Sequence, residues 1–416
     1  MSDPARPPPL TPYHRRLFFF LGVAGFFEGY DAFAFTQILP TLRAEMGLSK
    51  LGAGALVGFI NVGSILAYLL VRNADRWGRR RVLTITILGY ALCTLLTGLS
   101  PNVWVFGLLQ LVARVFLVAE WAIATVYAAE EFPAERRGTF IGILHGLNGF
   151  GAVACAGLVP AMLSTGLGWR GVYFVGAIPL LLMAFARRSL KETRRFSEQV
   201  ANRTGEPRPF TRILKPPWRG RMLQLALIWG LTYMCSTTAI TFWKEHAVGE
   251  RGMTDAQVGG NVSIAAVIAM PLAFGAGKLI DRVGRRAGAV IIYALMVLGT
   301  LGCYTLEARW MIIASLICGL SGITAVGVVL AAFNAELFPT DLRGDAFGWS
   351  NHLLGRVALV ISPLAVGYAA TSIGWGQAVS LTAIFPCIAL VLILVLLPET
   401  RGRELEETSR AGSDAG

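Results

Sequence analysis

The chain has 416 residues, of which 55% are hydrophobic and only 15% are charged, and its formal net charge is +12. So large an apolar fraction exceeds what the core of a water-soluble domain requires, and it excludes an ordinary soluble protein. The six cysteines all lie inside apolar stretches and show no metal-ligand spacing such as Cys-x-x-Cys. We therefore expect a membrane protein with no metal and no cofactor.

The apolar residues gather in twelve windows, each long enough to cross a hydrocarbon core of about 30 Å as one helix. The windows lie at about 17–39, 51–71, 81–99, 103–127, 139–164, 169–187, 222–246, 257–280, 287–305, 309–333, 345–370 and 375–397. They predict an all-α membrane protein with twelve transmembrane helices.

A charged motif between two of these windows occurs twice. Asp75-Arg76-Trp77-Gly78-Arg79-Arg80 returns 206 residues later as Asp281-Arg282-Val283-Gly284-Arg285-Arg286. The same offset relates Glu130-Glu131-Phe132-Pro133 to Glu336-Leu337-Phe338-Pro339. Matches in one register are typical of an internal duplication. The sequence therefore predicts two six-helix repeats.

Most of the positive charge falls on one side of a twelve-span arrangement. Residues 187–221 contain eleven Lys and Arg against three Glu, and the motifs at 72–81 and 278–286 add five and four more. Loops 99–103 and 371–377 on the other side contain none. By the positive-inside rule the basic side is cytoplasmic, which predicts an inner-membrane protein with both termini in the cytoplasm. Topology thus accounts for the charge, and we expect no nucleic-acid partner.

These patterns predict five regions along the chain. A Pro-rich, disordered cytoplasmic N-terminus spans 1–16, an N-terminal six-helix bundle 17–187, a cytoplasmic linker 188–221, a C-terminal six-helix bundle 222–397 and a cytoplasmic tail 398–416.

The first window carries two carboxylates in its middle. Glu28 and Asp31 are three residues apart and share one face of a helix. An ionised carboxylate at this depth is costly, and such acids usually face a bundle interior, pair with a cation or relay protons. We interpret both as proton-coupling residues. A static ion pair that fixes helix packing is the alternative.

The repeated charged motif also has a mechanical interpretation. Gly78 and Gly284 allow a tight turn, and Asp75 lies at the C-terminal end of a helix, where the dipole disfavours it and it seeks positive partners. A cluster of ion pairs there can latch two helix bundles together when the cytoplasmic side is closed. A topology signal alone is the alternative, but it does not account for the repeated Asp, Gly and Glu. The candidate gating residues are Asp75, Arg79, Glu130, Arg137, Glu192, Asp281, Arg285, Glu336, Arg343 and Glu399.

The fourth window supplies a cation and a third carboxylate. Arg114 lies near its middle, and Glu120 follows six residues later on a different face of the helix. We expect Arg114 to meet a carboxylate of the first window, so that protonation of the acid frees the arginine for an anion. Glu120 is either a further proton-coupling residue or a helix-packing contact.

Candidate substrate-binding residues come from both copies. In the eleventh window, Arg356 lies mid-helix and needs a partner or an anionic ligand, and Asn351 and His352 precede it. His145 corresponds to Asn351 by the offset of 206 residues. His145 and His352 can titrate near neutral pH and take part in coupling, or they can serve helix packing. Aromatic side chains can stack on a ring-containing ligand, although most serve packing in membrane helices. The candidates are Arg114, Tyr30, Trp121, Tyr233, Thr237, His352 and Arg356.

The repeats and motifs resemble the major facilitator superfamily over residues 15–405. Its loop signature Gly-x-x-x-Asp-Arg-x-Gly-Arg-Arg is complete at 277–286, whereas the first copy has Val71 in place of the first Gly. Glu-x-x-Pro-x-x-x-Arg-Gly at 130–138 and 336–344 is similar to the sugar-porter and organic-acid symporter branches. Glu28-Gly29-Tyr30-Asp31 resembles the acidic motif of the aromatic-acid and nicotinate symporters.

This resemblance implies an alternating-access transporter with its site near the bilayer midplane and Asp31 as the proton carrier. Sugar porters carry a Gln-Gln pair in the seventh helix, where this chain has Tyr233 and Thr237. We therefore predict proton-coupled import of a small organic acid, with a sugar or polyol symporter or uniporter as the alternative. From another class, the alternative is a non-transporting membrane sensor with a carrier fold, and the gating motifs in both copies argue against it.

No nucleophile–base or metal constellation occurs, so we do not expect an enzyme. The expected partners are a small organic anion, protons and the lipid bilayer, and we expect a monomer.

Overall fold

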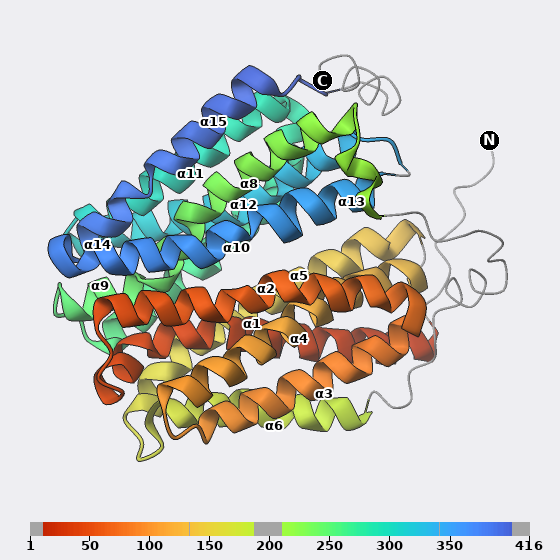
Figure 1. Cartoon of the computed structure of the whole chain (residues 1–416). Coiled ribbons are helices and arrows are strands. Elements are labelled where there is room, and N and C mark those ends of the chain that lie inside the picture. Colours follow the sequence, from red (N-terminus) through yellow and green to blue (C-terminus); the bar gives the residue numbers. More distant parts are fainter. Residues whose placement is uncertain (1–10, 133, 187–209, 341, 402–416) are drawn as a thin grey trace. The chain divides into compact units, whose positions relative to one another are not determined.

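The computed structural model describes residues 11–132, 134–186, 210–340 and 342–401, without the side chains of 74–76, 134–138 and 273–274 (Figure 1). Every regular element in these ranges is a helix. The first copy contains α1 (Pro12–Glu45), α2 (Lys50–Trp77), α3 (Arg79–Gly98), α4 (Val103–Glu131), α5 (Ala134–Leu163) and α6 (Gly168–Ala186). The second copy contains η2 (Phe210–Leu214), α8 (Trp218–Thr241), α9 (Trp243–Gly249), α10 (Asp255–Val283), α11 (Arg285–Thr305), α12 (Arg309–Glu336), α13 (Arg343–Phe347), η3 (Gly348–Gly355), α14 (Val357–Leu381) and α15 (Ile384–Leu396).

The predicted membrane spans are confirmed. In the described residues, ten helical segments are long and apolar enough to cross a membrane, and α10 is an eleventh that bends by 44° after Leu272. One of the ten, Arg343–Leu396, is 54 residues long and is interrupted at Gly374, whose φ of 80° and ψ of 166° are not helical. This segment therefore holds two spans, and the total agrees with twelve.

Local sequence explains where several helices begin. Asn102 caps α4, because its side chain accepts a hydrogen bond from the Val105 N–H at 3.0 Å. Thr254 and Gln257 form a capping box at the start of α10. Gly78 and Gly284 have φ values of 93° and 101°, a conformation that favours glycine, and each separates two consecutive helices.

The helices group into two compact units. Unit 1 comprises Met1–Ile38 and Leu66–Gly205, and unit 2 comprises Leu39–Ile65 and Glu206–Gly416. The end of α1 and the first half of α2 therefore belong to unit 2, although they come from the first copy of the repeat. The five sequence regions described above stay a prediction.

Glycines bring helices into close contact in each unit. In unit 1, a Cβ on Gly29 of α1 would lie 1.8 Å from the Asn148 carbonyl oxygen of α5. In unit 2, a Cβ on Gly299 of α11 would lie 2.1 Å from the Gly319 nitrogen of α12. Small residues of this kind let membrane helices pack backbone to backbone, and they fix the helices that carry the polar residues described below.

Candidate functional site

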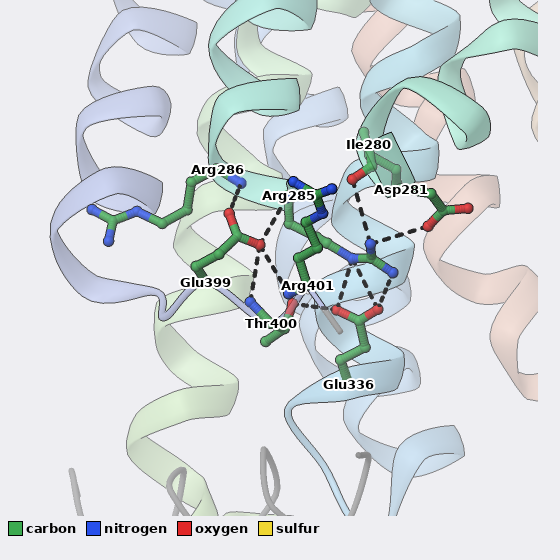
Figure 2. A network of polar contacts seen from close by, with 8 residues as sticks. All are labelled: Ile280, Asp281, Arg285, Arg286, Glu336, Glu399, Thr400 and Arg401. Atoms are coloured by element: carbon green, nitrogen blue, oxygen red, sulfur yellow. Dashed lines mark hydrogen bonds and ion pairs between the residues drawn. The ribbon is translucent and has the colours of Figure 1, made fainter. Parts of the chain in front are cut away.

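The charged motif of the second copy forms a network in unit 2 (Figure 2). Arg285 begins α11, and its guanidinium donates to Glu336 at the end of α12, with 2.7 Å between Nη2 and Oε1. Nη1 of Arg285 lies 3.0 Å from Oδ1 of Asp281, near the end of α10. The Thr400 hydroxyl also donates to Glu336. The network joins α10, α11, α12 and the segment after α15.

Glu399 caps the start of α11. Its carboxylate accepts hydrogen bonds from the backbone N–H groups of Arg285 and Arg286, at 2.9 Å each. The backbone N–H groups of Thr400 and Arg401 also donate to it, at 3.0 Å each. Partial burial raises the pKa of this carboxyl, but the four donors outweigh it and hold the pKa of Glu399 below its ordinary value. A helix N-terminus is a favourable place for an anion.

The first copy contains the same ion pair in unit 1. Arg79 Nη2 lies 3.4 Å from Glu130 Oε1, and the two side chains are 8% and 14% exposed. The offset of 206 residues carries this pair onto Arg285 and Glu336. The duplication therefore preserves a largely buried contact between the third and fourth helices of each copy.

The other gating candidates have different surroundings. Arg343 donates to the Phe338 carbonyl oxygen at 3.1 Å. The side chains of Asp75 and Arg137, and the whole of Glu192, lie outside the described residues. The contacts given above each join residues of a single unit, so a latch between two bundles stays a prediction.

Two acids lie in the middle of α1. Glu28 is 2% exposed and Asp31 is 6% exposed. Oδ2 of Asp31 accepts hydrogen bonds from the hydroxyls of Tyr90, at 2.7 Å, and Thr94, at 3.0 Å, both on α3. Oδ1 of Asp31 accepts no hydrogen bond from the described residues. Asp31 is thus held on one side only.

The third acid also faces α3. Glu120 of α4 is fully buried and accepts a hydrogen bond from the Thr86 hydroxyl at 2.6 Å. Sequence reasoning did not select Thr86, Tyr90 or Thr94. Their spacing of four residues, which places hydroxyl groups along one side of a helix, is the only signal for them in the sequence.

Arg114 of α4 is half-buried, and its guanidinium interacts electrostatically with Asp31. The structure therefore brings the cation of the fourth span to the acid of the first span. This is the arrangement in which protonation of one group changes what the other can bind.

Tyr30 and Trp121 contact different helices. Tyr30 is 1% exposed, and its hydroxyl donates to the Val172 carbonyl oxygen of α6 at 3.2 Å. The Trp121 ring lies edge-on to the ring of His145 on α5, with 4.8 Å between centroids. His145 itself is exposed.

The polar residues of the second copy meet around a π-helical segment, η3. The Tyr233 hydroxyl of α8 donates to Asn351 Oδ1 at 3.2 Å and also interacts with Arg356. Nη1 of Arg356 donates to the Ser64 carbonyl oxygen of α2 at 2.8 Å. A π-helical turn changes the direction of the side chains it carries, and such turns are frequent at functional sites.

His352 interacts electrostatically with Arg356, and Thr237 lies on the same helix as Tyr233. Thr237 is half-buried, one turn after Tyr233 on α8. The His352 ring lies edge-on to Phe347, with 5.1 Å between centroids. The structure thus joins Tyr233, Asn351 and Arg356 directly.

A second charged cluster of unit 2 lies around α9, and sequence reasoning did not identify it. Nε of Arg43, at the end of α1, donates to Glu245 Oε2 at 3.0 Å, and the Glu245 side chain is 1% exposed. Lys50, at the start of α2, lies 3.2 Å from Glu250. These partners are about two hundred residues apart in the chain, so no local pattern could reveal them.

Glu250 also caps a helix start. Its carboxylate accepts the backbone N–H groups of Trp375, at 2.6 Å, and Gly376, at 3.0 Å, and lies 2.8 Å from His246 Nδ1. Burial raises the pKa of this carboxyl, but the hydrogen bonds outweigh it and lower the pKa of Glu250 to about 2. Glu250 and Glu399 therefore hold two helix starts in the same way.

Twelve apolar spans in two related copies, with acids and arginines buried between the helices, define a polytopic membrane carrier. Residues 21–363 match the model of the Major Facilitator Superfamily, and the chain belongs to this family. It is a multi-pass membrane transporter and not an enzyme.

Several known transporters are similar to the chain over nearly its whole length. It is 28% identical over 401 residues to the probable 4-methylmuconolactone transporter of Cupriavidus pinatubonensis, covering 92% of this chain and 90% of that protein. It is 24% identical over 438 residues to the niacin transporter NiaP of Acinetobacter baylyi, covering 96% and 97%. A solved D-xylose–proton symporter has a TM-score of 0.75 and 18% identity, over 94% of this chain and 99% of that chain, which shows the shared fold.

Proposed function

We propose that this transporter imports a small organic acid together with protons. The observation that carries the proposal is the buried carboxylate of Asp31, which interacts with the Arg114 guanidinium inside unit 1. A buried membrane acid that is neither at a helix end nor in a loop is usually retained for function.

The coupling follows from the chemistry of this pair. While Asp31 is ionised, it attracts the Arg114 guanidinium and competes with any anionic ligand for it. When Asp31 takes up a proton, the attraction is lost and Arg114 becomes available to a carboxylate. A proton and an anion are therefore taken up together.

Arg356 provides a second cation for the same ligand class. Its guanidinium forms hydrogen bonds with the Tyr233 hydroxyl and the Ser64 carbonyl oxygen. Both partners are neutral, so these contacts do not compensate its charge. A ring-bearing carboxylate fits such a group, because arginine can bind the carboxylate and the Tyr233 ring can stack on the ligand. Two relatives are named for niacin and 4-methylmuconolactone, which are small ring compounds with a carboxyl group.

Alternating access requires groups that close the carrier on each side of the membrane, and the charged contacts of the structure fit this requirement. We assign the loops around Arg79–Glu130 and Arg285–Glu336 to the cytoplasmic side, with both termini there and the chain in the inner membrane, because the basic loops lie at this end. The cluster of Arg43, Glu245 and Glu250 then lies on the outer side. The bundles 17–187 and 222–397, joined by 188–221, would move as the two halves of the carrier.

The first test is thermal unfolding of the purified full-length protein with benzoate, nicotinate, muconate, xylose and glycerol, at two pH values. A compound that binds the folded state raises the melting temperature by mass action. We expect a carboxylate to stabilise the wild type and to lose its effect in Arg114→Ala or Arg356→Ala. Stabilisation by xylose or glycerol alone, unchanged in both variants, would contradict the organic-acid proposal and favour a sugar or polyol carrier.

The second test is uptake into proteoliposomes of whichever panel member stabilises the protein. An inward proton gradient should drive its accumulation above equilibrium. Uptake that equilibrates but never exceeds the outside concentration would exclude proton coupling while leaving transport intact.

A further inference from the structure

Helix α3 carries a line of hydroxyl groups towards two buried acids. Thr86, Tyr90 and Thr94 recur at every fourth residue, so they lie on nearly one side of the helix, each about 6 Å from the next along its axis. All three are fully buried. Thr86 donates to Glu120, whereas Tyr90 and Thr94 both donate to Asp31.

The two carboxylate oxygens of Asp31 have different surroundings. Oδ2 accepts the hydrogen bonds of Tyr90 and Thr94, and Oδ1 accepts none from the described residues. A Cβ added to Gly176 of α6 would lie 3.6 Å from Oδ1, so this oxygen faces a helix that presents no side chain at that position. Donors to a carboxylate stabilise its charged form, while the second oxygen keeps room for a proton.

The charged and titratable groups around Asp31 come from every neighbouring helix. They are Glu28 and Tyr30 on α1, Tyr90 on α3, Arg114 on α4, Cys155 on α5 beside Tyr30, and Tyr173 on α6. Of these, Arg114 favours the charged carboxylate through space, and Tyr90 does so through a hydrogen bond. Thr94 adds a second hydrogen bond that does not depend on any ionisable group.

The second copy lacks most of this line. By the offset of 206 residues, Thr86 and Tyr90 correspond to Ile292 and Met296 of α11, and Glu120 corresponds to Val326 of α12. The fold of a six-helix copy therefore does not require these polar groups. Where α11 does bury a tyrosine, the Tyr293 hydroxyl bonds a neutral partner, Thr232, at 2.7 Å.

We propose that Tyr90 and Thr94 are positioning residues that set the pH at which Asp31 binds its proton, which is taken up at Oδ1 while the two hydroxyls hold Oδ2. The inference rests on the proposed role of Asp31 in proton coupling and assigns control of that role to α3. Removing either donor destabilises the ionised carboxylate, so Asp31 should take up its proton at higher pH.

Infrared difference spectroscopy tests this without any substrate. Spectra of the full-length protein in lipid vesicles, titrated with pH, follow the C=O stretch of protonated carboxylic acids, and the band lost in Asp31→Asn reports Asp31. Tyr90→Phe should move the midpoint of that band upward by about one pH unit, the size expected for one hydrogen bond to a charged group. Thr94→Val should move it in the same direction, and Thr94→Ser, which keeps the hydroxyl, should restore the wild-type midpoint.

Two control variants separate positioning from a general loosening of the protein. Thr86→Val removes a hydroxyl from the same side of α3 that serves Glu120, and Tyr293→Phe removes a buried tyrosine hydroxyl from α11. Both should leave the Asp31 midpoint unchanged. An unchanged midpoint in Tyr90→Phe and Thr94→Val, or an equal shift in Tyr293→Phe, would overturn the inference.

The proposed function can fail independently. If the Asp31 midpoint moves as expected but the same vesicles show no proton-driven uptake of benzoate, nicotinate or muconate, α3 positions Asp31 and the proposed coupling is wrong. If vesicles show proton-driven uptake while the midpoint does not respond to either α3 variant, the coupling stands and the role of α3 is refuted. If no band of the wild type is lost in Asp31→Asn at any pH, Asp31 does not bind the proton and the inference falls.

Discussion

The two copies of the repeat agree at their loops and differ in the middle of their spans. Arg79–Glu130 and Arg285–Glu336 are the same contact, 206 residues apart. Between the loops, unit 1 buries Glu28, Asp31 and Glu120 deep inside helices. In the described part of unit 2, every carboxylate lies within three residues of a helix end or outside a helix.

We propose that this difference separates the contacts that serve the fold from those that serve transport. A loop that joins two membrane helices needs its charges neutralised in either copy, so the arginine–glutamate pair is kept twice. A carboxylate in the middle of a span has a large desolvation cost and is not needed for packing, because the second copy folds with Thr237 and Val326 at the positions of Asp31 and Glu120. We infer that proton chemistry is confined to unit 1 and that Arg356 gives unit 2 a role in ligand binding.

Asp31 gives the strongest test of the assignment of proton chemistry to unit 1. Asp31→Asn should abolish accumulation of the transported acid above equilibrium while it spares exchange of that acid across the membrane, because the variant cannot change its charge. Tyr293→Phe, which removes a buried hydroxyl group from α11 of the second copy, should leave proton-driven accumulation in place. The measurement is uptake and counterflow in proteoliposomes, and uphill uptake by Asp31→Asn would refute the assignment of proton chemistry to unit 1.

Substitution of Arg356 tests the inferred role of unit 2 in ligand binding. Arg356→Gln should raise the KM of the transported acid by roughly tenfold to a hundredfold, the loss expected for a hydrogen bond between charged groups. The pH at which transport is half-maximal should stay at its wild-type value, because Arg356 belongs to the group of Tyr233 and Asn351 in unit 2. Arg114→Gln should change both quantities. A shifted pH profile in Arg356→Gln would show that the two units share the proton chemistry.

Glycine 284 tests the scaffold that the copies share. A Cβ at Gly284 would lie 2.8 Å from Oε2 of Glu399, and its φ of 101° disfavours any other residue. Gly284→Ala should therefore lower the free energy of unfolding by about 1–3 kcal/mol. Gly277→Ala is the matched control in α10, since its added Cβ would meet nothing within 4 Å. Denaturant unfolding in detergent compares them, and equal stability of the two variants would contradict the capping role of Glu399.

The sequence was sufficient for the spans, the duplication and the family, because each rests on hydropathy or on a repeated pattern of many residues. The acids of α1 could also be selected as candidate functional residues from the sequence, because a carboxylate in the middle of an apolar window is costly and is seldom kept without a function. The α3 hydroxyls were not, because Thr and Ser in helices commonly bond their own backbone, as Thr97 does with the Cys93 carbonyl oxygen. Nothing in the sequence marks the π-helical segment Gly348–Gly355 either.

The capping of helix starts by Glu250 and Glu399 could not be predicted from the sequence either. The donors to Glu250 are backbone N–H groups 125 and 126 residues away, and every residue except proline carries such a group. Gly374 before them has a φ of 80°, like Gly284 before the donors to Glu399. Only the folded chain relates the two glutamates to each other.

The smallest expected effect concerns the helix start that Glu250 caps. The pKa of Glu250 is lowered to about 2 from an ordinary value of 4.5, so its contribution to stability is complete above pH 4.5 and is lost as the pH falls towards 2. At neutral pH, Glu250→Gln should cost only about 1 kcal/mol, because the side chain is 26% exposed and solvent screens its contacts with Lys50 and His246. Melting temperatures of wild type and variant should differ at neutral pH and converge below pH 4.5. A difference that stays constant down to the most acidic pH tolerated would mean that the charge of Glu250 does not hold this helix start.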